Sequence, residues 1–456
     1  MPIKSIHLTN YYHKNSGGIS TAYNKLLEGA NRHERYVRLI VPGEESCVEE
    51  VGEFGRIYYV KAGFSPVFDK RYRILMPWNT YIFDESPIKK ILRDEAPDII
   101  EIGEKYTLSL MAGLIRKGTM NITPNRPMLV HFSCERMDDN VGAFISSGKM
   151  SKRFSRAFIR NYVFPMFDFH LTNSDYTAAE LLDAISSRDD VSKPKHLMNF
   201  FWRLFRSVKS TASERVFVNQ CGADVETFSS SRKNAEKRQQ ICREYGLPET
   251  AKILLYAGRI SPEKNVALLP KIMEELAANG KTDFRLLIAG AGPKAEWLAA
   301  ECEKTAKGKA VMLGQISNIE KLADLFANCD AFVHPNPREP FGITPLEAMA
   351  SGLPVAAPNS GGVLSYANRD NAWLCEPNAK CFSDAIRDIF RDDAQRKAKV
   401  QNALETSRKY KWETSIANLF RLYDKMFEEF SQNRSVYAYE MAAKDFNFSQ
   451  KSISKA

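Results

Sequence analysis

The chain has 456 residues, and at roughly 150 residues per domain it is long enough for two or three domains. Its 64 Lys and Arg residues outnumber its 55 Asp and Glu residues, which gives a net charge of +9, and hydrophobic residues make up 44% of the chain. This composition excludes a wholly disordered or fibrous protein. The mild positive excess fits an anionic partner such as a phosphate ester or an acidic lipid. We expect no nucleic-acid partner.

The sequence contains no segment typical of membrane spanning or of secretion. No run approaches the roughly 18 apolar residues that a membrane helix needs, and the first residues lack the order of a secretion signal. The eight cysteines are scattered without a Cys-x-x-Cys pair, which argues against a zinc cluster and against a dense disulfide framework. We therefore expect a cytoplasmic protein with no metal site and no cofactor.

Short apolar runs alternate with longer helix-like segments along the first half of the chain. The runs that predict strands are Ser5–Leu8, Tyr36–Val41, Ile57–Val60, Ile99–Ile102, Met128–His131 and His170–Thr172. Such alternation is typical of a parallel sheet with crossover helices, and it predicts an α/β domain.

The same pattern repeats after residue 250, which predicts a second α/β domain. Its expected strands are Ile253–Ala257, Arg285–Ala289, Ala310–Leu313, Ala331–His334 and Pro354–Ala357. Helix-like segments include Asn265–Ala278 and Ile319–Ala327. We expect the two domains to join near Gly222–Ser231, and the residues after Phe430 to form a polar tail.

Two glycine turns follow expected strands of the second domain. Gly258 precedes Arg259, and Lys264 comes five residues later; a glycine here allows close approach of a ligand, and the two cations suit a diphosphate. A solvated basic loop is the alternative. Gly290 lies in a second turn, at the edge of the sheet where open α/β sheets bind ligands. There the alternative is a tight turn that requires glycine.

The segment His334–Gly352 carries the most specific pattern. A strand ends in a proline-rich loop, and a helix is expected to begin near Thr344, so that backbone N–H groups at its start could bind a phosphate. These N–H groups belong to Phe341, Gly342 and Ile343. Glu339 precedes this site and Glu347 follows eight positions later; two carboxylates around such a helix start suit the recognition of sugar hydroxyls.

This segment resembles the Glu-x7-Glu signature of retaining nucleotide-sugar glycosyltransferases of family four, which have the GT-B fold of two Rossmann-like domains with a cleft between them. Other motifs of that family follow in the expected order: Ser16-Gly17-Gly18-Ile19, Asn173–Thr177, Gly222-Ala223-Asp224, Phe228, Gly361-Gly362 and Trp412. The resemblance covers about residues 5–430. It implies an acceptor domain at residues 1–221, a donor domain at 222–410, a segment 411–430 that crosses back onto the first domain, and a tail at 431–456.

The resemblance also implies roles for residues in the donor domain. Arg259 and Lys264 match the pair that holds the donor diphosphate, and Glu347 matches the residue that binds the nucleotide ribose. Glu339, together with the helix start at Phe341–Ile343, matches the site of the transferred sugar and the leaving phosphate. Gly290 is expected to help bind the donor.

In the first domain, Gly18 matches the loop glycine that lets the domain close on the donor. His131 is where the family often has a His beside the sugar, and a structural histidine is the alternative. One departure is Ser365, which stands where the family often has a Glu three positions after the glycine pair.

A basic and aromatic region, at 149–164 and 192–210, is a candidate membrane surface. On a helical wheel, cations fall within roughly 100° of arc, away from an apolar arc of Met150, Phe154, Ala157 and Phe158. These cations are Lys149, Lys152, Arg153, Arg156 and Arg160. Residues 197–208 add the aromatic side chains Phe200, Phe201, Trp202 and Phe205. Such segments can lie in an anionic membrane interface, or they can pack on the sheet with the cations in water.

Together these features predict a retaining, metal-independent glycosyltransferase that moves a hexose from a nucleotide-diphosphate sugar to an acceptor hydroxyl. Metal independence is expected because no Asp-x-Asp pair stands at a strand end. We expect a lipid-linked or cell-envelope glycan acceptor, and a cytoplasmic protein that can bind peripherally to the cytoplasmic face of the membrane. The alternatives are a soluble small-molecule acceptor, an epimerase or phosphorylase on the same fold, and a non-catalytic nucleotide-sugar-binding protein.

Overall fold

A computed structural model of the chain describes residues 3–13, 17–65, 72–139, 149–186, 200–205, 212–278, 282–434 and 437. The chain divides into two compact units. Unit 1 consists of Met1–Gln220 with Ser415–Ala456, and unit 2 consists of Cys221–Thr414. The first division, after residue 220, lies one residue before the expected boundary, and the second, after residue 414, lies four residues beyond the expected one. Most of the expected tail, 431–456, lies outside the described residues.

Unit 1 contains a mostly parallel sheet with the strand order β10-β9-β8-β7-β1-β2-β4-β3, in which only β3 runs antiparallel to its neighbour. The strands are β1 (Lys4–Leu8), β2 (Tyr36–Gly43), β3 (Cys47–Val51), β4 (Gly55–Lys61), β7 (Ile99–Ile102), β8 (Met128–Ser133), β9 (Phe169–Thr172) and β10 (Val216–Val218). Every strand expected in this half is present, which confirms the α/β class. The short strands β3 and β10 were not predicted.

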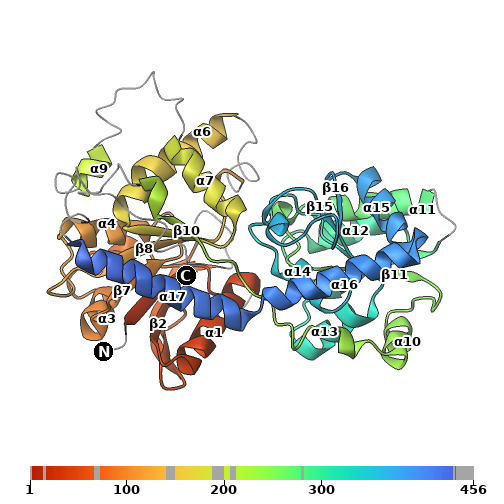
Figure 1. Ribbon diagram of the computed structural model, residues 1–456, viewed down its shortest axis with the longest axis horizontal. Coiled ribbons are helices and arrows are strands. Elements are labelled where there is room, and N and C mark those ends of the chain that lie inside the picture. The colour runs from red at the N-terminus through yellow and green to blue at the C-terminus, as the bar shows by residue number, and fades with distance from the viewer. Residues whose placement is uncertain are drawn as a thin grey trace. The chain divides into compact units, whose positions relative to one another are not determined.

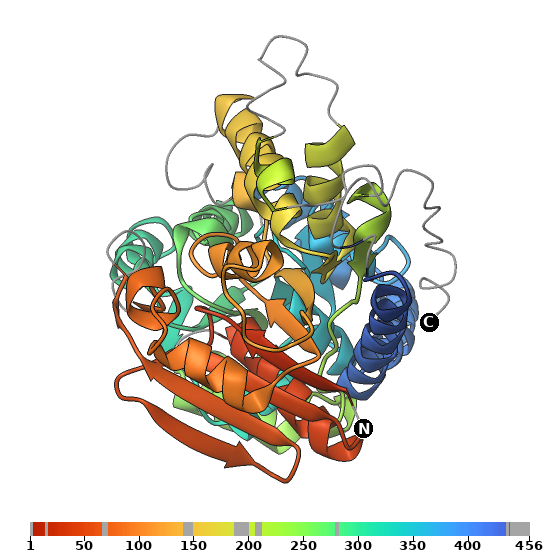
Figure 2. The ribbon, with the colours of Figure 1, turned by 90° about the vertical axis from the view of Figure 1, so that its left-hand side faces the viewer.

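Helices cover both faces of this sheet (Figures 1 and 2). They include α1 (Gly17–Arg32), α3 (Pro87–Glu95), α4 (Ser109–Lys117), α6 (Lys149–Phe158), α7 (Asp175–Ser186), α9 (Phe200–Leu204) and α17 (Trp412–Gln432). Successive residues of a strand point to opposite faces. Accordingly, Ile6 and Leu8 of β1 share an apolar cluster with α3 and α4. His7 between them instead pairs with Glu101, whose carboxylate also accepts a hydrogen bond from Tyr423 of α17.

Helix α17 packs closely on α1. Gly29 of α1 leaves room for Ile416, because a Cβ atom at Gly29 would lie 2.4 Å from the Ile416 side chain. Arg35, just after α1, also pairs with Asp424 of α17. The segment expected to cross back therefore belongs to the core of unit 1 from Ser415 onward.

Unit 2 contains a parallel sheet with the order β13-β12-β11-β14-β15-β16. Its strands are β11 (Lys252–Ala257), β12 (Phe284–Ala289), β13 (Ala310–Gly314), β14 (Ala331–Val333), β15 (Val355–Pro358) and β16 (Trp373–Cys375), and its helices include α10 (Ala235–Glu244), α11 (Leu268–Ala278), α12 (Ala295–Thr305), α13 (Ile319–Asn328), α14 (Ile343–Ala350), α15 (Ala379–Arg391) and α16 (Asp393–Lys409). This is the strand order of the Rossmann fold, and the chain reverses direction across the sheet between β11 and β14. Ligands of open α/β sheets bind outside the carboxyl ends of the strands at such a point.

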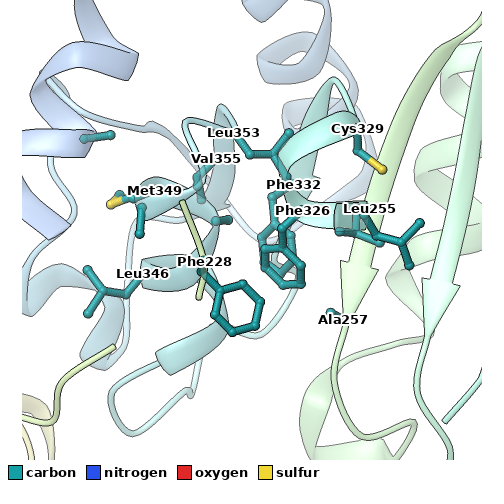
Figure 3. Packing of buried hydrophobic residues seen from close by; sticks show 14 of the residues in the cluster. Phe228, Leu255, Ala257, Phe326, Cys329, Phe332, Leu346, Met349, Leu353 and Val355 are labelled. Atoms are coloured by element: carbon teal, nitrogen blue, oxygen red, sulfur yellow. The ribbon is translucent and has the colours of Figure 1, made fainter. Parts of the chain in front are cut away.

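An aromatic core supports the helix that follows β14. The rings of Phe326 and Phe332 stack with their centroids 5.3 Å apart, and Phe228 meets Phe326 edge-on at 5.1 Å. Figure 3 shows these rings between Leu255 of β11 and Met349 of α14. Because this core is fully packed, the start of α14 is held in a fixed position beside the carboxyl end of β11.

Candidate functional site

Two glycine turns of unit 2 pack directly on each other at the carboxyl ends of β11 and β12. Gly258 donates its backbone N–H to Ala289 at 2.9 Å. A Cβ atom at Gly290 would lie 1.9 Å from the carbonyl oxygen of Gly258, and one at Gly292 would lie 2.2 Å from that of Ile260. This packing alone requires glycine at 290, so the tight-turn alternative accounts for Gly290 without a ligand.

Lys264 and Glu339 meet at the point where the strand order reverses. Lys264 ends a short helical turn after β11, and Glu339 lies in the loop after β14. The Lys264 Nζ atom lies 2.8 Å from both carboxylate oxygens of Glu339. Two further groups face the same carboxylate: Asn336 donates to Oε2 at 2.9 Å, and His334 Nε2 lies 3.8 Å from Oε2. Neither Asn336 nor His334 was predicted as a site residue, although both precede Glu339 in the same segment.

Burial alone would raise the pKa of Glu339, but Lys264 outweighs this effect with help from His334 and Asn336, and the pKa falls to about 2. Glu339 is therefore ionised at neutral pH. The ion pair is only partly buried: the side chain of Lys264 is 28% exposed and that of Glu339 is 12% exposed.

Arg259 lies in the same loop as Lys264, and its guanidinium is partly exposed. Its Nη1 atom lies 4.0 Å from Glu263, and its carbonyl oxygen accepts a hydrogen bond from Tyr256 at 2.9 Å. Asn265 ties this loop to the next one, because its Nδ2 atom donates to the carbonyl oxygen of Pro335 at 2.9 Å. The structure thus joins the loop of the two expected cations to the loop that holds Glu339.

The helix α14 begins at Ile343, one residue before the expected start. Gly342 precedes it with φ at +91°, a conformation that favours glycine, and its carbonyl oxygen accepts a hydrogen bond from Tyr366. The Phe341 side chain is buried against Tyr366, with ring centroids 5.3 Å apart. Phe341 is therefore an apolar anchor, and only its backbone is available at the helix start.

The glycine pair after β15 packs against this loop. Gly362 donates its N–H to the Glu339 carbonyl oxygen at 2.6 Å, and a Cβ atom at Gly362 would lie 1.9 Å from the Pro340 carbonyl oxygen. Ser365 follows, and its own carbonyl oxygen accepts a hydrogen bond from Tyr410 at 2.7 Å. The glycine pair therefore shapes the loop that holds Glu339.

Glu347 lies in the second turn of α14 and is 9% exposed. Its burial, and secondarily the charge of Asp224, raise its pKa to about 8. Asp224 is itself held by Thr227, which donates from its N–H and its hydroxyl at 3.0 Å each. The Glu347 carboxyl is therefore mostly protonated at neutral pH.

In unit 1, the structure favours the structural alternative for His131. The strand was expected to end at His131, but β8 continues to Ser133, so that His131 is fully buried in the core. Its ring lies 5.2 Å from Phe167, and its Nδ1 atom lies 3.3 Å from Nδ1 of His170. The His131 side chain therefore has no exposed surface in this structure. Gly18 is exposed and lies in the first turn of α1, which is helix where a loop was expected.

The expected basic arc is only partly at the surface. Lys152 and Arg153 are exposed, and Arg156 lies 3.5 Å from Asp183. Arg160 is 7% exposed, in the π-helical turn Ile159–Val163 that follows α6, so its assignment to a solvated face is wrong. The Lys149 side chain lies outside the described residues.

The aromatic stretch is also mostly core. Trp202 and Phe205 are buried, and Trp202 donates from Nε1 to the Arg160 carbonyl oxygen at 3.1 Å. The expectation of a second membrane-facing helix is therefore wrong for these two side chains. Large apolar side chains do reach the surface on α6, where Met150 is 83% exposed and Phe154 is 59% exposed. Phe200 is exposed too.

Membrane-spanning helices and metal-binding clusters are both absent from the described part of the chain. No helix there is long and apolar enough to cross a membrane. No group of three or more His, Cys, Asp or Glu side chains there could hold a metal ion.

The amino-acid sequence is similar to those of known glycosyltransferases. Residues 237–406 match the family described as Glycosyl transferases group 1. A GDP-mannose-dependent alpha-(1-6)-phosphatidylinositol dimannoside mannosyltransferase of Mycobacterium tuberculosis (strain H37Ra) is 24% identical over 423 residues, which are 91% of this chain and 95% of the relative.

The solved structures that resemble this chain support its fold. A sucrose-phosphate synthase from Thermosynechococcus elongatus has a TM-score of 0.67 at 20% identity, over 93% of this chain and 100% of the other. The Anabaena protein HepE in complex with UDP-glucose has a TM-score of 0.64 at 15% identity, over 94% of this chain and 100% of the other. The expected GT-B fold, with two Rossmann-like units, is confirmed.

Proposed function

We propose that this chain, a glycosyltransferase with a glycosyl transferases group 1 domain at residues 237–406, moves a hexose from a nucleotide-diphosphate sugar to an acceptor hydroxyl with retention of the anomeric configuration. The observation that carries this proposal is the pairing of Lys264 with Glu339 at the switch point of the unit 2 sheet. A cation and a carboxylate at that edge offer one group to a diphosphate and the other to sugar hydroxyls.

The leaving diphosphate is stabilised by protein groups. Lys264 and Arg259 supply positive charge, and the start of α14 supplies backbone N–H groups at the positive end of the helix dipole. When the bond between the sugar's anomeric carbon and the phosphate oxygen breaks, the electron pair stays on that oxygen, and these groups stabilise the developing charge. Metal independence follows from this assignment of charge carriers and is part of the proposal.

Retention is explained by front-face attack. The acceptor hydroxyl attacks on the side from which the diphosphate leaves, and the departing phosphate oxygen accepts the hydroxyl proton. Glu339 accepts hydrogen bonds from hydroxyls of the transferred sugar, and Glu347 accepts them from the ribose. These steps do not use His131, whose side chain is buried.

The relative from Mycobacterium tuberculosis supports a first choice of donor and acceptor. Its name specifies GDP-mannose and a phosphatidylinositol dimannoside. We therefore propose GDP-mannose as the first donor to test and UDP-glucose as the second, because HepE has been seen with UDP-glucose. A lipid-linked acceptor agrees with the exposed Met150 and Phe154 beside Lys152 and Arg153 on α6.

The test of the donor site is titration of the chain with GDP, UDP and ADP, followed by assays of donor cleavage with and without membranes. Binding of one nucleotide together with cleavage of the matching sugar donor is the expected result. If the chain binds none of the three, the non-catalytic alternative fails as well, and the site assignment is wrong. If it binds a nucleotide but cleaves no donor even with membranes present, a nucleotide-sugar-binding protein is the better description.

The membrane test uses liposomes and variants of matched charge. Each cation near an anionic surface contributes about 1 kcal/mol, and salt screens the contribution. We expect sedimentation with acidic liposomes at low salt, reduced in a Lys152→Gln, Arg153→Gln, Phe154→Ser variant. The control is Lys304→Gln, Lys307→Gln, two exposed cations of unit 2. Wild-type chain that stays in the supernatant would favour a soluble small-molecule acceptor.

A further inference from the structure

His334 is a buried histidine directly behind the Glu339 carboxylate. It follows β14, its side chain is nearly inaccessible, and its Nε2 atom lies 3.8 Å from Oε2 of Glu339. Among the described residues, no group hydrogen-bonds to this Nε2 atom. Burial lowers the pKa of His334 to about 4, with Glu339 opposing and Lys264 adding to the effect. The ring is therefore neutral at pH 7.

The Nε2 atom of His334 thus lacks a hydrogen-bond partner among the described residues, although a carboxylate oxygen lies 3.8 Å away. A buried donor that is left without an acceptor destabilises the arrangement that contains it. In the ligand-free arrangement His334 cannot bond to Glu339, because Lys264 holds both carboxylate oxygens at 2.8 Å and Asn336 donates to Oε2 at 2.9 Å. In a state in which Lys264 turns away from Glu339, Oε2 could accept a hydrogen bond from His334, and the Nε2 atom would gain a partner.

The proposed function supplies such a state. Lys264 is assigned to the donor diphosphate, and an ammonium that turns toward phosphate oxygens loosens its two bonds to Glu339. The Glu339 carboxylate then keeps Asn336 and needs a second donor to remain ionised and oriented in a buried site. His334 Nε2 lies 3.8 Å from Oε2 and has no hydrogen-bond partner among the described residues.

We propose that His334 is a positioning residue for Glu339: once Lys264 turns to the donor diphosphate, the Nε2–H group of His334 donates to Oε2 and holds the carboxylate in place for the hydroxyls of the transferred sugar. His334 acts through Glu339, because its Nε2 atom is covered and cannot reach a ligand itself. This role rests on the proposed function, which assigns Lys264 to the diphosphate and Glu339 to the sugar.

Two substitutions separate the hydrogen bond from the packing. His334→Phe keeps a flat ring of similar size but has no donor, whereas His334→Gln can place an amide N–H close to the position of Nε2. A hydrogen bond to a charged group is worth about 1.5–3 kcal/mol, so the Phe variant should lose roughly tenfold or more in kcat for donor cleavage. Its affinity for the nucleoside diphosphate alone should fall as well, because the diphosphate draws Lys264 away and the hydrogen bond from His334 then forms without a sugar. The Gln variant should recover most of the turnover.

A spectroscopic measurement tests the exchange of partners without turnover. In chain labelled with ¹⁵N-histidine, the Nε2–H signal that is lost in His334→Gln should shift downfield when GDP or UDP is added, whichever the chain binds. Lys264→Ala should show the shifted signal already without nucleotide, because Glu339 has then lost its competing partner.

The outcomes distinguish a failure of the role of His334 from a failure of the proposed function. If His334→Phe turns over like the wild type, or if His334→Gln is as slow as His334→Phe at an unchanged melting temperature, His334 has no positioning role. An Nε2–H signal that is unmoved by nucleotide and by Lys264→Ala would overturn it too. The proposed function itself fails if the wild-type chain binds neither GDP, UDP nor ADP, or if Lys264→Ala leaves the nucleotide affinity unchanged.

Discussion

Nucleotide binding should strengthen as the pH rises from 7 to 9, and Glu347 is the cause. Burial, with a smaller effect of Asp224, raises the pKa of this carboxyl to about 8 in the ligand-free chain. A carboxylate can accept hydrogen bonds from both hydroxyls of a ribose, whereas a protonated carboxyl cannot accept on both oxygens as well. Ribose binding should therefore require the ionised form.

The size of the effect follows from that pKa. At pH 7 about one Glu347 in ten is ionised, and at pH 9 about nine in ten are. Because apparent affinity scales with the fraction of binding-competent chain, the dissociation constant should fall about tenfold over this range. Binding at pH 7 should release close to one proton, because the bound carboxyl must ionise.

Titration calorimetry can measure both quantities, with GDP and UDP as ligands. Affinity is followed between pH 7 and 9, and proton release is obtained at pH 7 from buffers of different ionisation enthalpy. Glu347→Gln should bind more weakly at pH 9 and lose most of the pH dependence, while Glu296→Gln, an exposed residue of α12, should keep it. Wild-type affinity that is flat from pH 7 to 9, or a slope that survives in Glu347→Gln, would refute this account of the ribose site.

The same carboxyl should also affect stability, in the opposite direction. Its usual pKa of 4.5 applies to the unfolded chain, so between pH 4.5 and about 8 the folded chain holds the proton more firmly. The free energy of unfolding therefore falls as the pH rises through this window. Glu347→Gln removes that loss, and its melting temperature should exceed that of the wild type at pH 8 to 9 but differ little at pH 4. A residue that costs stability and supports binding is typical of a functional site.

Three further predictions follow from the described contacts. Lys264→Ala should lower donor turnover on the order of 100-fold. Lys309→Ala, which removes a cation 2.6 Å from Asp283, should leave turnover unchanged; equal activity of the two variants would remove Lys264 from the site. Tyr423→Phe should destabilise unit 1 by about 1–3 kcal/mol in urea unfolding because it removes a buried hydrogen bond to Glu101, whereas Tyr59→Phe loses only an exposed one; equal effects would contradict a role for burial. Excess chelator should leave donor cleavage near its untreated rate, and loss of activity that magnesium or manganese restores would overturn the assignment of the diphosphate charge to protein cations.

The strands and the Glu-x7-Glu segment could be predicted because their signals are local. An apolar run bounded by turn residues needs no information from distant parts of the chain, and every expected strand is present. The spacing of Glu339 and Glu347 is likewise set within one loop and one helix. Strand ends are harder to predict from such signals. The strand β8 continues to Ser133, so His131 lies within the strand and not at its end, and its side chain is buried.

The basic arc failed for a different physical reason. A helical wheel gives the direction of a side chain but not what lies beside it. Lys152 and Arg153 are exposed, whereas Arg160, in the π-helical turn Ile159–Val163, is buried. The wheel also separates polar from apolar faces without telling which face is covered, so Trp202 and Phe205 could not be assigned to core or surface from their pattern.

The pairing of Lys264 with Glu339 could not be predicted from spacing, because it depends on strand order. The two residues are 75 positions apart, and β12 and β13 lie between them in the sequence, yet β11 and β14 are neighbours in the sheet. The consequence bears on the choice of ligand. Under the proposed function, a nucleoside diphosphate alone would take Lys264 from Glu339 and leave the carboxylate with less compensation, whereas an intact sugar donor would offer phosphate oxygens to the cation and hydroxyls to the carboxylate. The ion pair should therefore give the complete donor a higher affinity than the nucleoside diphosphate product. Before the donor binds, the charges of Lys264 and Glu339 neutralise each other.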